Sequence, residues 1–210
     1  HCRGFLAQAR WLVEQEVSIS GDASGWPISF PHPDVHGNGS WLSATAQGGA
    51  LSVLLRAHQL TREEIFLEIV RRAVHTFERD ILDGGVGAPV GEDGVFFEEA
   101  AIYPAAHVLS GFIFALIGLY DYKLLAGNAQ IEKLIDRSIR TLHNLIDGFD
   151  VGFWTYTDLL HRRLASDSEL TLQIDLLEAL ADYSGCDHCS TIAVRWKGYQ
   201  KRSGSRLRYL

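Results

Sequence analysis

Hydrophobic residues recur every three or four positions along most of the chain, which is the spacing of an amphipathic α-helix. This pattern predicts helices over residues 5–13, 42–60, 61–81, 104–125, 129–146, 170–183 and 190–201. The third of these starts with Thr61 and Glu64 at the spacing of a capping box, in which two side chains bond each other's backbone amides. Because the connections between successive helices are short, we expect antiparallel helical hairpins.

Glycine and proline mark the segments between the helices. Residues 21–25 are typical of a turn, residues 26–40 of a long loop with one short extended piece, and residues 152–156 of an irregular link. Residues 86–90 and 95–97 flank a Gly-Glu-Asp-Gly turn and predict a β-hairpin. Small residues at 44–50 predict close approach of another backbone. The expected fold is all-α, a stacked or toroidal array of helical hairpins with one small β-hairpin.

Composition and charge limit the classes of partner. The chain has 210 residues, 47% hydrophobic and 21% charged, which suits one globular domain with a core that needs no metal or disulfide. A net charge of −7 gives no electrostatic reason to expect nucleic-acid binding. No acidic residue follows Asp187, and we interpret the basic tail as a solvated helix end.

The longest apolar run, residues 108–122, is too short to cross a bilayer and is interrupted by Ser110, Gly111 and Asp121. We therefore expect no membrane span. No leader peptide is visible, and the sequence leaves the compartment open. A homodimer is among the assemblies that it also leaves open.

Cysteine and histidine spacing gives little support for a metal centre or a cofactor. Cys186 and Cys189 have the C-x-x-C spacing of redox and zinc sites, but no second Cys or His pair follows at the spacing of a zinc finger. Three cysteines also make a poor disulfide framework. The chain lacks phosphate-binding, dinucleotide-binding and nucleophile-elbow motifs. We expect neither a metal nor a cofactor.

Residues 96–107 form the segment richest in reactive side chains, with Glu98, Glu99, Tyr103 and His107 close together between the predicted hairpin and the next helix. Adjacent carboxylates on an extended chain point to opposite faces, so only one of Glu98 and Glu99 can line a given cavity. The competing interpretation is that the two acids lie early in a helix, favoured by its dipole, and that Tyr103 is a packing residue.

Two further clusters have a functional and a structural interpretation. On a helix from Thr157, Asp158 and His161 would lie one turn apart, where the carboxylate could orient the imidazole beside Arg162, or simply form a salt-bridged surface. Gln47 lies in a small-residue helix start, where it could bind sugar hydroxyls or serve as a core amide bonded to the backbone.

Four segments together resemble the C-terminal domain of D-glucuronyl C5-epimerase: GWPI at 25–28, WLSATAQGGALS at 41–52, LSGFIFALIGLYD at 109–121 and RWKGY at 195–199. Their order and spacing also match that domain. The resemblance implies an all-helical, (α/α)-toroid-like domain with a substrate cleft. It divides the chain into a leading helix and turn (1–24), a family core (25–203) and a basic tail (204–210).

The resemblance also implies acid/base chemistry, carried in the family by tyrosines and a glutamate. The glutamate falls on Glu99, but the family's tyrosines fall on Ala100, Thr157 and near Glu169. In an active epimerase we expect Glu99 and Tyr103 to act on one face of carbon 5, and Tyr156 with Asp158 or His161 on the other. Substrate-binding candidates are Trp26, Trp41, Gln47, His107, Arg162 and Arg163.

The function implied by the resemblance is epimerisation at carbon 5 of D-glucuronate in a heparosan-like polysaccharide, by removal and return of a proton. The expected partner is therefore a polysaccharide or oligosaccharide that contains uronic acid. Two alternatives stay open. The altered tyrosine positions favour a non-catalytic glycan-binding or scaffold domain, and a uronate lyase would begin with the same proton abstraction.

Overall fold

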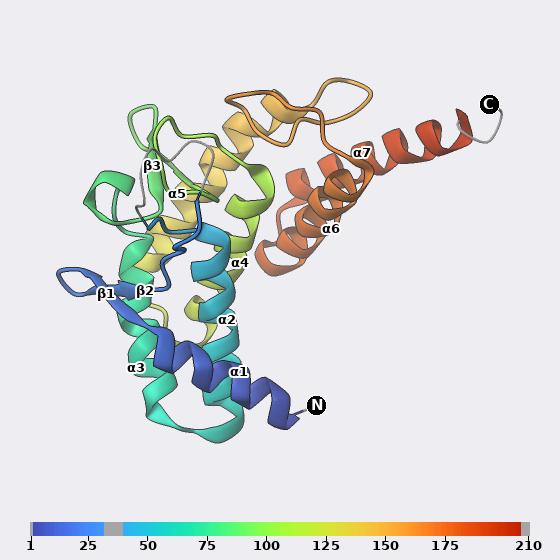
Figure 1. Ribbon diagram of the computed structural model, residues 1–210. Coiled ribbons are helices and arrows are strands. Elements are labelled where there is room, and N and C mark those ends of the chain that lie inside the picture. Colours follow the sequence, from blue (N-terminus) through green and yellow to red (C-terminus); the bar gives the residue numbers. More distant parts are fainter. Residues whose placement is uncertain (1, 32–39, 207–210) are drawn as a thin grey trace.

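The computed structural model describes residues 2–31 and 40–206, and it is predominantly helical (Figure 1). Within these residues lie seven α-helices: α1 (Cys2–Gln15), α2 (Ala44–Thr61), α3 (Glu64–Ala73), α4 (Leu109–Ala126), α5 (Ala129–Leu145), α6 (Asp167–Ser184) and α7 (Asp187–Arg206). Helices α2–α3, α4–α5 and α6–α7 form successive pairs, and α2 packs on α4, which packs on α6. The helical hairpins predicted by the hydrophobic periodicity are confirmed.

The contact between α2 and α4 depends on glycine. A Cβ atom added at Gly48 would lie 2.8 Å from the backbone oxygen of Phe114, and one added at Gly118 would lie 2.5 Å from the oxygen of Gly48. Neither position leaves room for a side chain, so the two backbones touch. The close approach predicted from small residues at 44–50 is confirmed.

Helix α4 is apolar around its whole circumference, as expected for a helix in the centre of a core. By length and composition it could cross a membrane, but half of it is buried against the rest of the protein. Phe112, Leu116 and Leu119 are fully buried among residues of the neighbouring helices. The expectation that this apolar stretch is too short to cross a bilayer is therefore wrong on length.

The first hairpin does not contain the predicted capping box. Thr61 is the last residue of α2, and its hydroxyl donates to the oxygen of Ala57 at 2.9 Å and accepts from the amide of Glu63. Arg62 then takes a left-handed conformation (φ 62°). Because Thr61 bonds back to its own helix, α3 begins at Glu64 without a side-chain cap. Helix α3 also ends earlier than predicted, at Ala73 rather than near residue 81.

Helix α4 begins five residues later than predicted. His107 has a positive φ of 56°, outside the right-handed helical region, and its amide donates to the buried carboxylate of Glu98 at 2.9 Å. This bond keeps residues 104–107 in a loop. The peptide bond between Tyr103 and Pro104 in this loop is cis.

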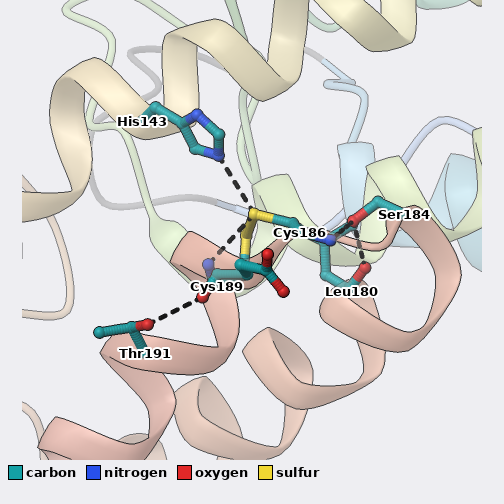
Figure 2. The surroundings of a disulfide bond; sticks show 7 residues. His143, Leu180, Ser184, Cys186, Cys189 and Thr191 are labelled. Carbon is teal, nitrogen blue, oxygen red and sulfur yellow. Dashed lines mark hydrogen bonds between the residues drawn. A yellow bond between two sulfur atoms is a disulfide. The ribbon is translucent and has the colours of Figure 1, made fainter.

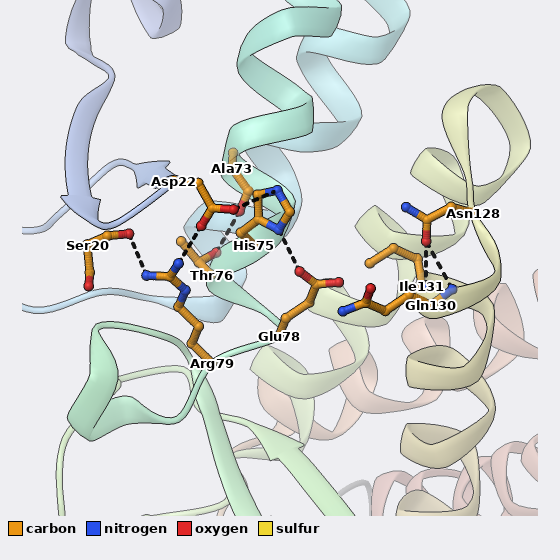
Figure 3. A network of polar contacts seen from close by, with 10 residues as sticks. All are labelled: Ser20, Asp22, Ala73, His75, Thr76, Glu78, Arg79, Asn128, Gln130 and Ile131. Atoms are coloured by element: carbon orange, nitrogen blue, oxygen red, sulfur yellow. Dashed lines mark hydrogen bonds and ion pairs between the residues drawn. The ribbon is translucent and has the colours of Figure 1, made fainter.

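Two small antiparallel hairpins accompany the helices. Strands β3 (Gly87–Val90) and β4 (Gly94–Phe97) form the predicted hairpin, whereas β1 (Val17–Ser20) and β2 (Ala23–Gly25) form a second one that was not predicted. Between β1 and β2, residues 21–22 make the turn, and Figure 3 shows Arg79 bonded to Ser20 and Asp22. These bonds fasten the first hairpin to the chain that follows α3.

The structure describes the two ends of the long loop predicted over residues 26–40. Its two ends pair through an antiparallel bridge between Ile28 and Trp41, which is the short extended piece expected there. Residues 32–39 lie outside the described residues.

The link between α6 and α7 carries the two paired cysteines. Gly185 ends α6 in a left-handed conformation, and Cys186 is joined to Cys189 in the first turn of α7 by a disulfide (Figure 2). The count of three cysteines gave no indication of this pairing.

Helix α7 packs along α6 and also bonds, through three side chains, to Asp150 in the segment after α5. Burial alone would raise the pKa of this carboxyl, but hydrogen bonds from Gly152, Trp196, Arg195 and Tyr199 outweigh burial and hold the pKa below its usual range. We expect Asp150→Asn to lower the free energy of unfolding at pH 7 by about 1 kcal/mol. The contribution is lost as pH falls through the depressed folded-state pKa, so urea unfolding at pH 7 and pH 3 should show the two proteins converging in acid. An equal difference at both pH values would contradict this role.

Candidate active site

A pocket of about 530 Å³ lies where two loops meet. One loop follows β4 and precedes α4, and the other joins α5 to α6; both lie at the same end of the helical pairs (Figure 1). The residues that line the pocket are Glu99, Ala100, Ile102, Pro104, Ala106, Val108, Thr157, His161, Arg163 and Glu169.

Backbone hydrogen bonds hold the two loops together. The amide of Leu109 donates to the backbone oxygen of Thr157 at 3.3 Å, and the amide of Leu159 donates to the backbone oxygen of Ala106 at 3.0 Å. Residues 150–166 therefore form no helix: their backbone groups bond to the opposite loop and within short bridges instead. The condition under which Asp158 and His161 would lie one helical turn apart, a helix from Thr157, is therefore not met.

The adjacent acids Glu98 and Glu99 point to opposite faces, as predicted. Glu98 is fully buried and accepts hydrogen bonds from the amide of His107 and from its Nδ1, the latter at 2.5 Å. This clamp closes the loop before α4. Glu99 instead faces the pocket. Because both acids precede a loop, the interpretation that they lie early in a helix is wrong.

Glu99 lies against the first turn of α4 because that turn has no side chain in the way. A Cβ atom at Gly111 would come within 2.5 Å of the Cβ of Glu99. Burial raises the pKa of Glu99, and the nearby Glu169 carboxylate raises it further, although the hydroxyl of Ser110 and the charge of Arg163 oppose them. A raised pKa brings a carboxyl closer to the range in which it can both accept and release a proton in catalysis.

Glu169 lines the same pocket but has the opposite electrostatic environment. It forms a true capping box with Ser166 at the start of α6, accepting from the Ser166 amide at 2.7 Å. Those bonds, with smaller contributions from Thr157 and Arg163, lower the pKa of Glu169. Two carboxyls whose pKa values are pushed apart can take different roles in proton transfer.

Asp158 fixes the conformation of the second loop through its buried carboxylate. Its buried carboxylate accepts from the amide of His161 at 2.6 Å and from Nε of Arg163 at 3.0 Å. The predicted orientation of the imidazole by Asp158 is therefore not observed, since the contact is with the backbone. Asp158 acts as a positioning residue that brings His161 and Arg163 to the rim of the pocket.

The other predicted catalytic and carboxylate-binding residues do not line this pocket. Tyr103 is 44% exposed, and its hydroxyl contacts Asp80 at 3.3 Å. Tyr156 is partly buried, with its carbonyl bonded to Gln173. Arg162 is exposed in a left-handed conformation (φ 50°). Their catalytic and binding roles stay predictions.

Four predicted sugar-binding residues are also absent from the lining of this pocket. Gln47 is fully buried, and its side chain accepts from the Trp26 amide at 3.1 Å and donates to the Trp26 carbonyl at 3.0 Å. This is the core amide bonded to the backbone that the structural interpretation predicts. The Trp26 indole donates to the oxygen of Leu12. Trp41 borders a separate hollow of about 160 Å³. His107 contacts Glu98 and the ring of Phe96, 4.6 Å between centroids.

Sequence reasoning did not select Thr157 and Glu169 as site residues. They were noted only as positions where the family's tyrosines are replaced. Their spacing in the sequence gives no reason to place them beside Glu99. Thr157 lies in a loop 58 residues after Glu99 and Glu169 lies further on, at the start of a helix, so the three meet only in the folded chain. The sole available signal was the resemblance, which assigned acid/base groups to positions 100, 157 and 169.

The fold defines the general class of protein. The structure is similar to cellobiose 2-epimerase from Spirochaeta thermophila, with a TM-score of 0.62 and 13% identity over 92% of this chain and 51% of that one. It is also similar to the unsaturated glucuronyl hydrolase of Bacillus sp. GL1, with a TM-score of 0.57 and 12% identity over 93% of this chain and 53% of that one. These likenesses confirm the (α/α)-toroid-like fold.

The particular family follows from the sequence itself. Residues 20–198 match the family described as D-glucuronyl C5-epimerase C-terminus, and the chain belongs to this family. It is 31% identical over 222 aligned residues to D-glucuronyl C5-epimerase from Caenorhabditis elegans, an alignment that covers 95% of this chain and 35% of the relative. The chain thus spans about a third of that relative's length.

Proposed function

We propose that this protein binds a glycan containing uronic acid in the pocket lined by Glu99 and exchanges the proton at carbon 5 of the sugar. One observation carries the proposal: Glu99 borders the same cavity as Ala100, Thr157 and Glu169, at or near which the resemblance places the family's tyrosines. They come from three separate parts of the chain, and the cavity brings them together around a carboxyl with a raised pKa.

The proposed chemistry divides among three side chains. Glu99 takes the proton from carbon 5, and the electron pair of the broken bond moves into the sugar carboxylate to form an enediolate. The Arg163 guanidinium, at the rim, stabilises the added negative charge. His161, also in the lining, returns a proton from its imidazole to the other face of carbon 5. Return from the original face regenerates the starting sugar.

Non-catalytic glycan binding is the second candidate, and a specific observation favours it. The pocket contains no phenol among its described lining residues, because Ala100, Thr157 and Glu169 occupy the positions of the family's tyrosines. A pocket without those groups could still bind a uronate through Arg163.

Deuterium exchange separates these functions. We expect that incubation of the protein with a heparosan-type polysaccharide in deuterium oxide places deuterium at carbon 5 of the uronate, detected by NMR. The same polysaccharide, incubated with heat-denatured protein, is the control.

Each outcome of this experiment leads to a different conclusion. No deuterium, with binding still measured by titration calorimetry, would contradict the proposed exchange and support a binding domain. An unsaturated sugar that absorbs near the ultraviolet edge would identify a lyase, because the enediolate would then have expelled the substituent at carbon 4.

A further inference from the structure

A second cluster of reactive side chains lies away from the pocket, between α5 and the link from α6 to α7. His143 comes from the last turn of α5, Cys186 precedes α7 and Cys189 lies in its first turn. Figure 2 shows His143 Nε2 directed at Cys186 Sγ, at 3.1 Å. The imidazole nitrogen and the two sulfur atoms all lie within 4.8 Å of one another.

These separations are close to those that a tetrahedral metal site requires. With metal–nitrogen bonds of about 2.0 Å and metal–sulfur bonds of about 2.3 Å, tetrahedral angles place two sulfurs roughly 3.8 Å apart and a nitrogen and a sulfur roughly 3.5 Å apart. The His143–Cys186 distance is within about half an ångström of that value. When the disulfide is reduced, the two sulfur atoms move apart to van der Waals separation, which brings them closer to the spacing of metal-bound thiolates.

The surroundings favour Cys186 as a thiolate. The amide of Cys189 donates to Cys186 Sγ at 3.1 Å, and the N-terminus of α7 supplies partial positive charge. Ser184 accepts from the amide of Cys186 at 3.2 Å and donates to Leu180 O at 2.6 Å, which fixes the link (Figure 2). Such bonds around a ligand orient it and stabilise its anionic form.

We propose that Cys186, Cys189 and His143 of the reduced protein bind a divalent cation of the zinc class. Two thiolates and an imidazole select zinc over magnesium or calcium, which prefer oxygen ligands. The His188 ring lies 5.0 Å from that of His143, between ring centroids. The disulfide and the metal exclude each other, because sulfur atoms bonded to each other are not thiolates.

This proposal departs from the expectation of no metal, which rested on ligand spacing. The third ligand, His143, precedes Cys186 by 43 residues and is brought to it only by the packing of α5 beside the α6–α7 link.

Cobalt(II) binding to the full chain tests the site. We expect the protein, reduced with a phosphine and kept without oxygen, to bind one equivalent of cobalt with the visible absorption of a tetrahedral thiolate complex. Zinc should displace the cobalt. The Cys2→Ser variant is the matched control, because Cys2 is exposed and distant in α1 and its loss should leave the spectrum unchanged.

Removal of ligands should abolish or weaken binding. Cys186→Ser should lose the thiolate-to-cobalt absorption. His143→Ala should weaken cobalt binding about tenfold or more, because losing even a residue that only hydrogen-bonds to a metal ligand typically weakens metal binding about 10–100-fold. His143 is exposed, so its variant should keep the wild-type circular dichroism. The site is refuted by no spectrum in the reduced wild type, by a spectrum that persists in both ligand variants, or by the same spectrum from the oxidised protein.

Discussion

Replacing Glu99 with glutamine is expected to reduce deuterium exchange at uronate carbon 5 at least about tenfold, since a positioned general base typically contributes about 10²–10⁴-fold. Glutamine has nearly the same shape, so it can keep the place against Gly111 and the contact with Ser110. What it loses is the ability to accept a proton. Because the pKa of Glu99 is raised, exchange by the wild type should also increase as pH rises through that pKa and the carboxylate forms.

The matched control for this variant is Glu92→Gln, at an exposed position in the turn between β3 and β4. It makes the same chemical change outside the pocket and should leave exchange unaltered. Equal exchange by the wild type and Glu99→Gln would remove Glu99 from the mechanism.

Stability gives an independent check on the same variant. A raised folded-state pKa means that the wild-type protein loses stability as pH rises from the pKa of the unfolded chain to that of the folded chain. Glu99→Gln has no such loss, so it should be more stable than the wild type at pH 7. Urea unfolding should show the advantage disappear below about pH 4.3, the ordinary pKa of glutamate. A variant that is inactive and also less stable would instead indicate damage to the fold.

The helical scaffold was predictable because its information is local. Periodic apolar residues locate each helix, and the glycines around residues 91–94 locate the β3–β4 turn. Errors arise where a backbone group bonds to a distant partner. Glu98 takes the amide of His107 and delays α4, while the loop after α5 bonds to the loop before α4 and forms no helix.

The candidate site was predictable only in part, for the same reason. The alternation of side chains along an extended segment correctly separates Glu98 from Glu99, since it needs only adjacent residues. It carries no information on partners that lie far along the chain. Thr157 and Glu169 reach the pocket through loop pairing and a helix cap, whereas Tyr103, four residues from Glu99, turns to Asp80.

The contact between α2 and α4 leads to the largest expected effect on stability. Gly118→Ala should lower the free energy of unfolding, because the new methyl group would lie 2.5 Å from the oxygen of Gly48 and 2.6 Å from its Cα. Backbone atoms cannot rotate away, so the helices must separate. Overpacking of this kind costs about 1–3 kcal/mol. Alanine offsets about 0.5–1 kcal/mol of this through its helix propensity, which leaves a net loss of up to roughly 2.5 kcal/mol.

Gly49→Ala is the control that separates packing from propensity. Gly49 adjoins Gly48 on the same helix but is exposed, and a Cβ atom there would meet nothing within 4 Å. It should stabilise the protein by about 0.5–1 kcal/mol, because alanine is the better helix former. Urea unfolding of both variants should therefore move the midpoints in opposite directions from that of the wild type. If Gly118→Ala moves in the same direction as Gly49→Ala, the two helices have room to spare and the glycine contact does not determine their spacing.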